Sequence, residues 1–491
     1  MPSKSTDVKL QNIPLNIPVN QNFIGRAFER KRLENIGRDD APAIIILYGR
    51  RRVGKTELLE QTFRDRNILK FEGRENVPEL QQMKRVMEEL AEYANQSLLK
   101  NVNVQSWREA FQYIHQQTTS GVWTIYFEEV QWLAQYKDDF ISELKYAWDN
   151  LFRLNKEIVL ILCGSSPSFM INQVMHSKAL YNRSQHEMHL EPFTLAEAAQ
   201  YLPKHTHRSV MDAYLTVGGI PVYLDRLKKK SSVLLSLCEN AFTKDAYFAN
   251  EYQKIFISSM SNNKHYQDVV RYLSQRKYAT RMELSKHLKL QSGSNLTALL
   301  ADLEICGFID KYAPYNTANN SKLVRYAIKD AYLQFYYKFI EPKAKQIASG
   351  RYNDNPRSAL SDNDYTQWLG YAFERFCRQN SHKIAKLLGF SAVNYTDGAF
   401  FNRETNKAAP GFQIDLLFDR ADQVITICEI KYSINKLSVK VIKEFEQKLE
   451  RFPNKANKSI QKVLIASAGV SDAVIDASYF DEIIILDDLF V

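Results

Sequence analysis

Cysteine is sparse in this sequence, and its spacing excludes two classes of site. The five cysteines, Cys163, Cys238, Cys306, Cys377 and Cys428, are dispersed, and no two stand in a Cys-x-x-Cys pattern. A zinc ribbon or a disulfide framework needs closer, paired spacing, so neither is indicated. An odd number of scattered thiols is typical of a reducing compartment, and we therefore expect a cytoplasmic protein.

Long hydrophobic runs are also missing. The longest, Ala43–Tyr48 and Ile158–Cys163, have six residues each, whereas a membrane-spanning helix needs about 20. The N-terminal segment has no unbroken apolar stretch of the kind found in secretory signals. We therefore expect no membrane partner.

Neither composition nor charge is extreme. Of 491 residues, 45% are hydrophobic and 25% charged, which excludes a mainly disordered, collagen-like or coiled-coil chain. The formal net charge of +9 is compatible with a nucleic-acid partner without requiring one. At about 150 residues per domain, the length predicts roughly three domains.

Three short apolar runs predict an α/β domain in the first part of the chain. They are Ala43–Tyr48, Val122–Phe127 and Ile158–Cys163, and helical patterns such as Val77–Ala94 separate them. Strands buried on both faces and alternating with helices are typical of a parallel sheet. From about residue 192 the buried strands stop and helical patterns follow.

A glycine-rich segment with the pattern GxxxxGK[ST] follows the first apolar run and precedes a helix. In this context the backbone N–H groups and the helix N-terminus bind phosphate. Lys55 would meet the β and γ phosphates of ATP, and the Thr56 hydroxyl would ligate Mg²⁺. We expected Lys55 to face solvent. The predicted nucleotide-binding residues of this segment are Gly49, Arg50, Arg51, Arg52, Val53, Gly54, Lys55, Thr56 and Glu57.

Two acids end the second apolar run. Glu128 is expected on the metal side, and Glu129 would polarise the attacking water. The alternative is an ordinary acidic strand end. If the third strand lies between the other two, Ser165 at its end would contact the γ phosphate. Arg183 would serve as an arginine finger, or is a surface arginine on a loop.

These motifs occur in an order that resembles the archaeal-type ATPase family, a branch of the STAND and AAA-like P-loop NTPases. The order runs from Phe23-Ile24-Gly25-Arg26 through the phosphate loop, Glu128-Glu129 and Asn182-Arg183 to Gly219-Ile220-Pro221. The resemblance implies that Gly25 and Arg26 lie near the adenine and that Pro221 belongs to a nucleotide-sensing helical lid. Glu128 stands where the family usually has Asp.

Residues 262–330 show three short helical patterns and then a ribbon, which predicts a winged helix. Its third helix, Ser294–Cys306, would be the recognition helix in a DNA-binding version. That helix carries no Arg or Lys, so an internal switch or a protein contact is an equal alternative.

The C-terminal segment contains four polar residues in a suggestive order. Glu374 lies on a helix, Asp415 begins a strand, and Glu429 and Lys431 share one face of the next strand. Converging carboxylates would bind Mg²⁺ and activate a water for phosphodiester cleavage, with Asp415 and Glu429 as metal ligands. The order resembles the PD-(D/E)xK nuclease superfamily. The alternatives are a nuclease fold without activity and a salt-bridged α/β domain without a site.

The sequence therefore predicts a multidomain α/β protein. Its parts are an N-terminal tail (1–20), a P-loop ATPase αβα domain (21–191), a helical lid (192–255), a winged helix (256–342), a linker (343–364) and a restriction-endonuclease-like α/β domain (365–491). The expected function is a Mg²⁺-ATP-dependent switch that controls a nuclease acting on DNA or RNA. The alternative is a regulatory ATPase that recognises a protein partner and carries a silent C-terminal domain.

Overall fold

The computed structural model describes residues 17–39, 41–177, 180, 186–259, 263–290, 293–315, 324–402 and 411–491. The chain divides into two compact units, which are treated separately below. The first comprises residues 1–191 with 257–261, and the second comprises residues 192–256 with 262–491.

The first unit is built on a five-stranded sheet with the order β2-β3-β4-β1-β5. Its strands are β1 (Ala43–Tyr48), β2 (Asn67–Glu72), β3 (Trp123–Glu128), β4 (Ile158–Gly164) and β5 (His186–His189). Every neighbouring pair is parallel, as predicted. Because β4 pairs with both β1 and β3, the three predicted strands are neighbours, and their carboxyl ends lie along the same side of the sheet.

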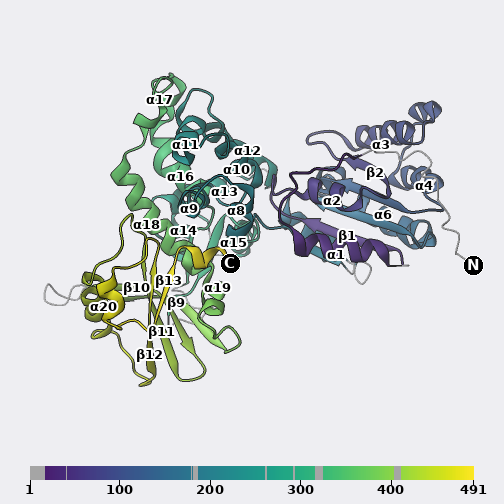
Figure 1. Cartoon of the computed structure of the whole chain (residues 1–491). Helices are drawn as coiled ribbons and strands as arrows, with labels where there is room; N and C mark the ends of the chain where they lie inside the picture. The colour runs from purple at the N-terminus through teal and green to yellow at the C-terminus, as the bar shows by residue number, and fades with distance from the viewer. Residues whose placement is uncertain are drawn as a thin grey trace, which may run out of the picture. The chain divides into compact units, whose positions relative to one another are not determined.

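Helices cover both faces of this sheet (Figure 1), and the side chains of β1 alternate between the two faces. Ile44 and Ile46 join one buried cluster, whereas Ile45 and Leu47 join another on the opposite face. The helices α3 (Glu79–Tyr93), α4 (Trp107–Gln117) and α6 (Asp139–Asn150) contribute to the first cluster, and α1 (Ala27–Arg38) and α2 (Lys55–Phe63) to the second. Shorter helices are η1 (Ser97–Asn101), α5 (Val130–Leu133), η2 (Phe152–Leu154), α7 (Pro167–Phe169) and η3 (Met170–Met175).

Helices begin the second unit. They are α8 (Leu195–Tyr201), α9 (His207–Val217), α10 (Pro221–Leu227), α11 (Val233–Phe242) and α12 (Tyr247–Ser259). The hydroxyls of Thr194, Thr206 and Ser232 cap the first turns of α8, α9 and α11. The glycine pair ends α9, because Gly218 has a φ of 73° and a Cβ at Gly219 would lie 2.0 Å from the Phe193 carbonyl oxygen.

A small three-stranded sheet follows. The helices α13 (His265–Ser274), α14 (Arg281–Leu288) and α15 (Ser294–Ile305) accompany the strands β6 (Ala279–Thr280), β7 (Ile309–Tyr312) and β8 (Arg325–Ile328). The strands are antiparallel in the order β6-β8-β7. Further short helices continue to residue 359, namely α16 (Ala331–Phe335), η4 (Tyr336–Ile340), η5 (Glu341–Lys343), α17 (Ala344–Ala348) and η6 (Pro356–Ala359).

The C-terminal part of the second unit contains a mixed sheet with the order β13-β12-β11-β10-β9 (Figure 1). Its strands are β9 (Tyr395–Asn402), β10 (Phe412–Arg420), β11 (Val424–Lys431), β12 (Ser459–Ala466) and β13 (Glu482–Ile485). The pairs β9–β10 and β10–β11 are antiparallel, and the other two are parallel. The helices are α18 (Asp362–Gln379), α19 (Ser381–Leu387), α20 (Lys440–Leu449), α21 (Asp472–Asp476) and η7 (Asp487–Phe490).

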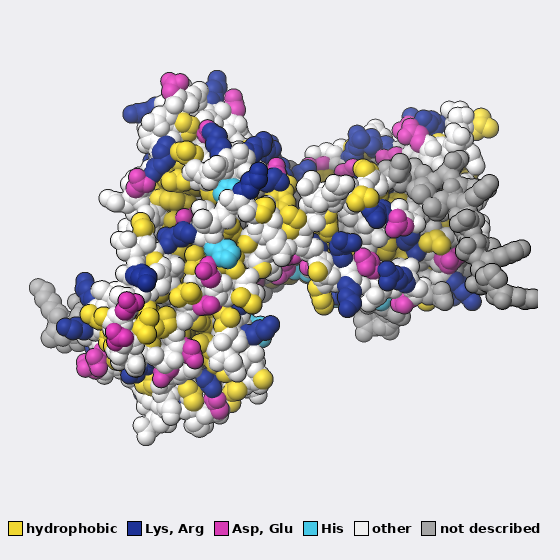
Figure 2. Space-filling model, viewed as in Figure 1, with side chains coloured by type: hydrophobic (Ala, Val, Ile, Leu, Met, Phe, Trp, Pro, Cys, Tyr) yellow, Lys and Arg dark blue, Asp and Glu magenta, His cyan; other side chains and the backbone are white. Residues whose placement is uncertain are grey.

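Three expectations from the sequence concern the whole chain: the state of its cysteines, membrane-spanning helices and the distribution of its charge. All five cysteines are free and buried. Within the described part of the chain, no helix combines the length and the apolar character needed to cross a bilayer. Figure 2 shows basic and acidic side chains interspersed over the visible faces of both units. The nine excess positive charges therefore do not form one continuous basic patch on those faces.

Candidate functional site

The phosphate loop lies between β1 and α2, as its sequence predicts. A Cβ at Gly49 would lie 2.3 Å from the Leu190 carbonyl oxygen, and Gly54 has a φ of 94° directly before α2. Only glycine meets both conditions without strain. The loop therefore presents its backbone next to the N-terminus of α2, where anions bind.

Lys55 is buried, with 7% of its surface exposed, and the expectation that it faces solvent is wrong. Its Nζ donates hydrogen bonds to the carbonyl oxygens of Gly49 at 2.9 Å and Arg50 at 3.1 Å. The ammonium group thus lies inside the loop that would surround a phosphate.

Three further residues predicted to bind the nucleotide are Arg26, Glu57 and Gly25. The Arg26 guanidinium donates to the carbonyl oxygens of Val53 at 2.9 Å and Glu191 at 2.8 Å, which ties the loop to the segment after β5. Glu57 accepts a hydrogen bond from the Asn20 amide at 2.7 Å. Gly25 has a φ of 70°. Of the loop arginines, Arg50 is buried, Arg52 is half-buried and Arg51 is exposed.

Thr56 and Glu128 lie together, although they are 72 residues apart. The Thr56 hydroxyl donates to Glu128 Oε1, and Lys70 Nζ lies 2.9 Å from Glu128 Oε2. A hydroxyl and a carboxylate are hard oxygen ligands, so this pair fits Mg²⁺. The same lysine also pairs with Glu60 at 2.9 Å. Burial alone would lower the pKa of Lys70, but Glu128 and Glu60 raise it above its usual range.

Glu129 is fixed against the end of β4. It has a φ of 53°, and its Oε2 accepts hydrogen bonds from the Ser165 backbone N–H at 3.1 Å, the Ser165 hydroxyl at 2.5 Å and the Gln131 amide at 2.6 Å. A Cβ at Gly73 would lie 2.6 Å from the Glu129 carbonyl oxygen, so glycine permits this close approach. The structure therefore brings Glu129 and Ser165 together beside Glu128.

For two remaining predicted residues the structure gives no position relative to this group. Arg183 lies outside the described residues. Pro221 is the first residue of α10 and belongs to the second unit. Their predicted roles stay predictions.

The sequence analysis missed Lys70 and Gln131 as site residues. Gln131 is fully buried, and its amide also donates to the Ser165 hydroxyl at 3.2 Å. A buried glutamine two positions after the acid pair was a usable signal. Lys70 offered none, because a lysine in a strand is usually a solvated side chain.

In the second unit, the structure brings Glu374, Asp415, Glu429 and Lys431 together. Glu374 comes from α18, Asp415 from β10 and the other two from β11. Lys431 Nζ lies 2.9 Å from Glu429 Oε1, and Glu429 is fully buried. The register between β9 and β10 shifts between Ile414 and Leu417, and such a bulge re-aims the side chains beside it.

The carboxyl groups of this cluster interact strongly. Burial, followed by the charges of Glu374 and Glu429, raises the pKa of Asp415 to about 7. Burial also raises the pKa of Glu374, although Arg378, Lys277, Arg375 and Lys431 oppose this change. These shifts are those expected of carboxyl groups that are withdrawn from water and held close together.

Lys448 is the residue of this cluster that sequence analysis missed. Its Nζ, on α20, lies 2.8 Å from Oε1 and 2.6 Å from Oε2 of Glu429. Val441, Phe445 and Lys448 follow the spacing of one helix face, and the first two are buried. A lysine in line with the buried apolar residues of a helix was the sequence signal that Lys448 pairs with a buried group. No group of three or more His, Cys, Asp or Glu side chains in the described ranges is arranged to hold a metal ion.

Comparison with known proteins gives matches for both the first part of the chain and most of its length. Residues 23–227 match the family model of an ATPase domain predominantly from Archaea. An uncharacterized protein of Methanocaldococcus jannaschii is 25% identical over 415 residues, which cover 84% of this chain and 87% of that protein.

Solved structures also resemble this chain. A Walker-type ATPase of Pyrococcus abyssi superposes with a TM-score of 0.48 and 18% identity, covering 64% of this chain and 96% of that one. The ORC2 protein of Aeropyrum pernix gives a TM-score of 0.45 and 11% identity, covering 68% and 98%.

Proposed function

We propose that the chain, of which residues 23–227 match the family model of an ATPase domain predominantly from Archaea, is a Mg²⁺-ATP-dependent switch controlling a nuclease-like domain. In this proposal the nuclease-like domain, residues 365–491, acts on DNA or RNA. Residues 192–255 form the helical lid, residues 256–342 a winged helix and residues 343–364 the linker. The order of three helices and an antiparallel ribbon supports the winged helix.

The ATPase domain supplies a phosphate site and a water-activating carboxylate. The backbone of the loop and Lys55 would bind the β and γ phosphates, and Thr56 with Glu128 would hold Mg²⁺, which neutralises phosphate charge when bound. Glu129 would take a proton from the attacking water, and Ser165 keeps its carboxylate in place for that step.

Replacing Lys55 tests nucleotide binding. Lys55→Ala is expected to weaken ATP binding by about ten- to a hundredfold, because charge-assisted hydrogen bonds contribute about 1.5–3 kcal/mol. The measurement is calorimetric titration with Mg²⁺-ATP. Since Lys55 is buried and bonded to two carbonyl groups, thermal unfolding of the same variant must be recorded alongside. The exposed Lys31→Ala is the matched control. Unchanged ATP affinity in a folded Lys55→Ala protein would contradict the assignment.

One observation carries the proposal of control: α9 contacts α18 and the residues that directly follow β11, and α18 and β11 are two of the three elements that hold the C-terminal acid cluster. At the end of β11, the Tyr432 hydroxyl donates to Asp212 at 2.5 Å, and Arg208 Nη1 donates to the Ser433 carbonyl oxygen at 2.6 Å. These two positions directly follow Lys431. On α18, which carries Glu374, the Tyr365 hydroxyl is 2.7 Å from the Thr216 hydroxyl.

The same helix ends in the Gly218-Gly219-Ile220-Pro221 segment. A nucleotide-dependent shift of that segment would therefore be transmitted through α9 to residues adjoining Lys431 and to the helix of Glu374. Hydrogen bonds that are wholly or partly buried suit this role, because a rigid contact moves both of its partners together.

Tyr432→Phe tests the coupling. The variant removes the hydrogen bond to Asp212, so the ratio of cleavage rates with and without ATP should fall by about tenfold, the scale of a bond to a charged group. ATP hydrolysis should be unchanged. The assay follows cleavage of labelled DNA and RNA with Mg²⁺, and Tyr479→Phe serves as the matched control. A full ATP response in the Tyr432 variant would rule out this route.

The second candidate function is a regulatory ATPase with a silent C-terminal domain, and one observation favours it. Lys448 and Lys431 already bind both oxygens of Glu429, at positions where a divalent cation would bind. A lysine in that position keeps the carboxylate neutralised without metal. Absence of cleavage by the wild-type chain with Mg²⁺ or Mn²⁺, with ATP and without, would decide for this candidate.

A further inference from the structure

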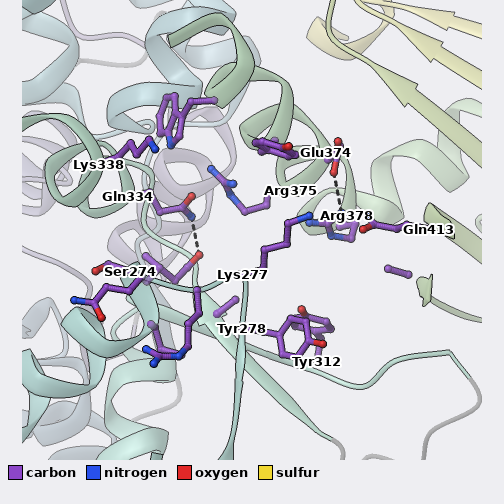
Figure 3. Close-up of a pocket in the computed structure, with 18 of the residues that line it drawn as sticks. Ser274, Lys277, Tyr278, Tyr312, Gln334, Lys338, Glu374, Arg375, Arg378 and Gln413 are labelled. Atoms are coloured by element: carbon purple, nitrogen blue, oxygen red, sulfur yellow. Dashed lines mark hydrogen bonds and ion pairs between the residues drawn. The ribbon is translucent and has the colours of Figure 1, made fainter. Parts of the chain in front are cut away.

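A cavity of about 380 Å³ in the second unit remains without a role (Figure 3). It is lined by residues 273–278, by α18 and by Phe401 and Gln413 of the C-terminal sheet. A second cavity of about 740 Å³ shares Lys277, Arg375 and Arg378 with it, so the two are adjacent. Their volumes lie in the range of small-molecule sites.

The walls of the smaller cavity are strongly basic. They carry five basic side chains, Arg276, Lys277, Lys338, Arg375 and Arg378, against two acidic ones, Asp364 and Glu374. Glu374 is engaged with Arg378 at 4.0 Å, and Asp364 is exposed. The remaining positive charge is therefore not cancelled inside the cavity.

Arg375 gives the strongest indication that the cavity binds an anion. It is half-buried, and its guanidinium makes no hydrogen bond or ion pair within the described ranges. The Trp368 ring lies 6.0 Å away, and the charge of Glu374 partly opposes the effect of burial on the pKa of Arg375. Burial, followed by the charge of Arg378, lowers its pKa to about 10. Figure 3 shows its guanidinium pointing into the cavity, toward the side lined by Gln334 and Lys338. A buried, unpaired cation is costly unless a ligand pairs with it.

Flat aromatic surfaces line the same space. Tyr278, Tyr312, Trp368, Tyr371 and Phe401 all contribute to the walls. The Lys277 ammonium lies 5.1 Å from the centre of the Tyr371 ring, which places a cation and a stacking surface side by side. Aromatic rings beside basic groups are the features that bind unpaired bases and their phosphates.

We propose that this cavity binds a nucleotide, with its phosphate on Arg375 and Lys277 and its base against the aromatic wall at Tyr371. An inorganic anion or an acidic peptide would satisfy the cations but leave the rings unused. The nucleotide is either the end of a single-stranded nucleic acid or a free nucleotide, since both offer a phosphate and a base.

The position of the cavity links it to the acid cluster. Gln413 lines the cavity, and its amide donates to Asp415 Oδ1 at 2.8 Å. Glu374 lines it as well. The inference rests on the proposed function in one respect, because a nucleic-acid end held here would lie beside the residues proposed to cut it.

Binding is tested with the full chain in EDTA and without ATP, so that neither cleavage nor hydrolysis contributes. The probes are a short oligothymidylate with a 5′-phosphate, the same oligonucleotide without it, and thymidine 5′-monophosphate. Arg375→Met should weaken binding of the phosphorylated probes by about ten- to a hundredfold, the scale of charge-assisted hydrogen bonds. The exposed Arg351→Met is the matched control and should bind like wild type.

A second variant tests the aromatic wall without disturbing the core. Tyr371 is 42% exposed. Tyr371→Leu should weaken binding by about fivefold or more through lost stacking, and Tyr371→Phe should retain it. Arg375→Met should not lower the midpoint of thermal unfolding, since it removes a half-buried charge that makes no ion pair within the described ranges.

The outcomes distinguish a nucleic-acid end from a free nucleotide. They also test this inference separately from the proposed nuclease function. Tighter binding of the phosphorylated oligonucleotide than of the monophosphate assigns the cavity to a nucleic-acid end, and equal binding assigns it to a free nucleotide. No binding of any probe, or wild-type affinity in Arg375→Met, overturns the inference. Arg375-dependent binding by a chain that cuts nothing would leave the inference standing and refute the nuclease function alone.

Discussion

Lys431→Ala is expected to lower Mg²⁺-dependent cleavage of labelled DNA or RNA by about 10² to 10³, the scale seen when one group that stabilises developing charge is removed. The ammonium group lies 2.9 Å from Glu429 and would face the phosphate that gains negative charge. The variant should fold, because Lys448 still binds both oxygens of Glu429.

The matched control for this experiment is Lys443→Ala, a change to an exposed lysine on α20. It should cut at the wild-type rate. If wild type cuts and Lys431→Ala cuts equally well, the cluster is not the cleavage site and the nuclease proposal fails for these residues.

Glu129→Gln should slow ATP hydrolysis by about 10² or more while ATP stays bound, which is the scale of a general base. Glutamine keeps the shape of the side chain and still offers an oxygen to the Ser165 N–H, so the loop geometry should persist. Phosphate release and nucleotide affinity are measured on the same protein. Glu143→Gln, at a surface ion pair with Arg108, controls for loss of one negative charge. Slow hydrolysis in Glu128→Gln with a normal rate in Glu129→Gln would transfer the role to Glu128.

Local sequence patterns predicted where the phosphate loop and the polar residues beside it lie in the first unit. The phosphate loop, the acid pair and Ser165 each lie at the carboxyl end of a strand, and these strands could be recognised because each is a short run of mostly apolar residues. Glu429 and Lys431 were likewise predicted to share a strand, and both lie on β11. β2 was missed because its sequence includes the charged side chain of Lys70.

Contacts between distant segments were the part that sequence patterns did not reveal. Lys448 reaches Glu429 from the following helix, and Lys70 reaches Glu128 from a neighbouring strand. The burial of Lys55 also depends on the fold of its own loop around it. Lys55 is buried and the other two lysines are half-buried, and each has polar partners that tertiary packing brings close rather than spacing along the chain.

The burial of the cysteines has a practical consequence for labelling. Burial raises the pKa of Cys163 and of Cys238 to about 12, and the thiolate is the form that reacts with maleimides. The folded native chain should therefore resist such reagents. Single cysteines introduced at exposed sites, Lys31→Cys in the first unit and Arg351→Cys in the second, would each accept a fluorophore while the native thiols stay in place. The wild-type sequence is thus a ready background for energy-transfer measurements of the distance between the two units as nucleotide is added.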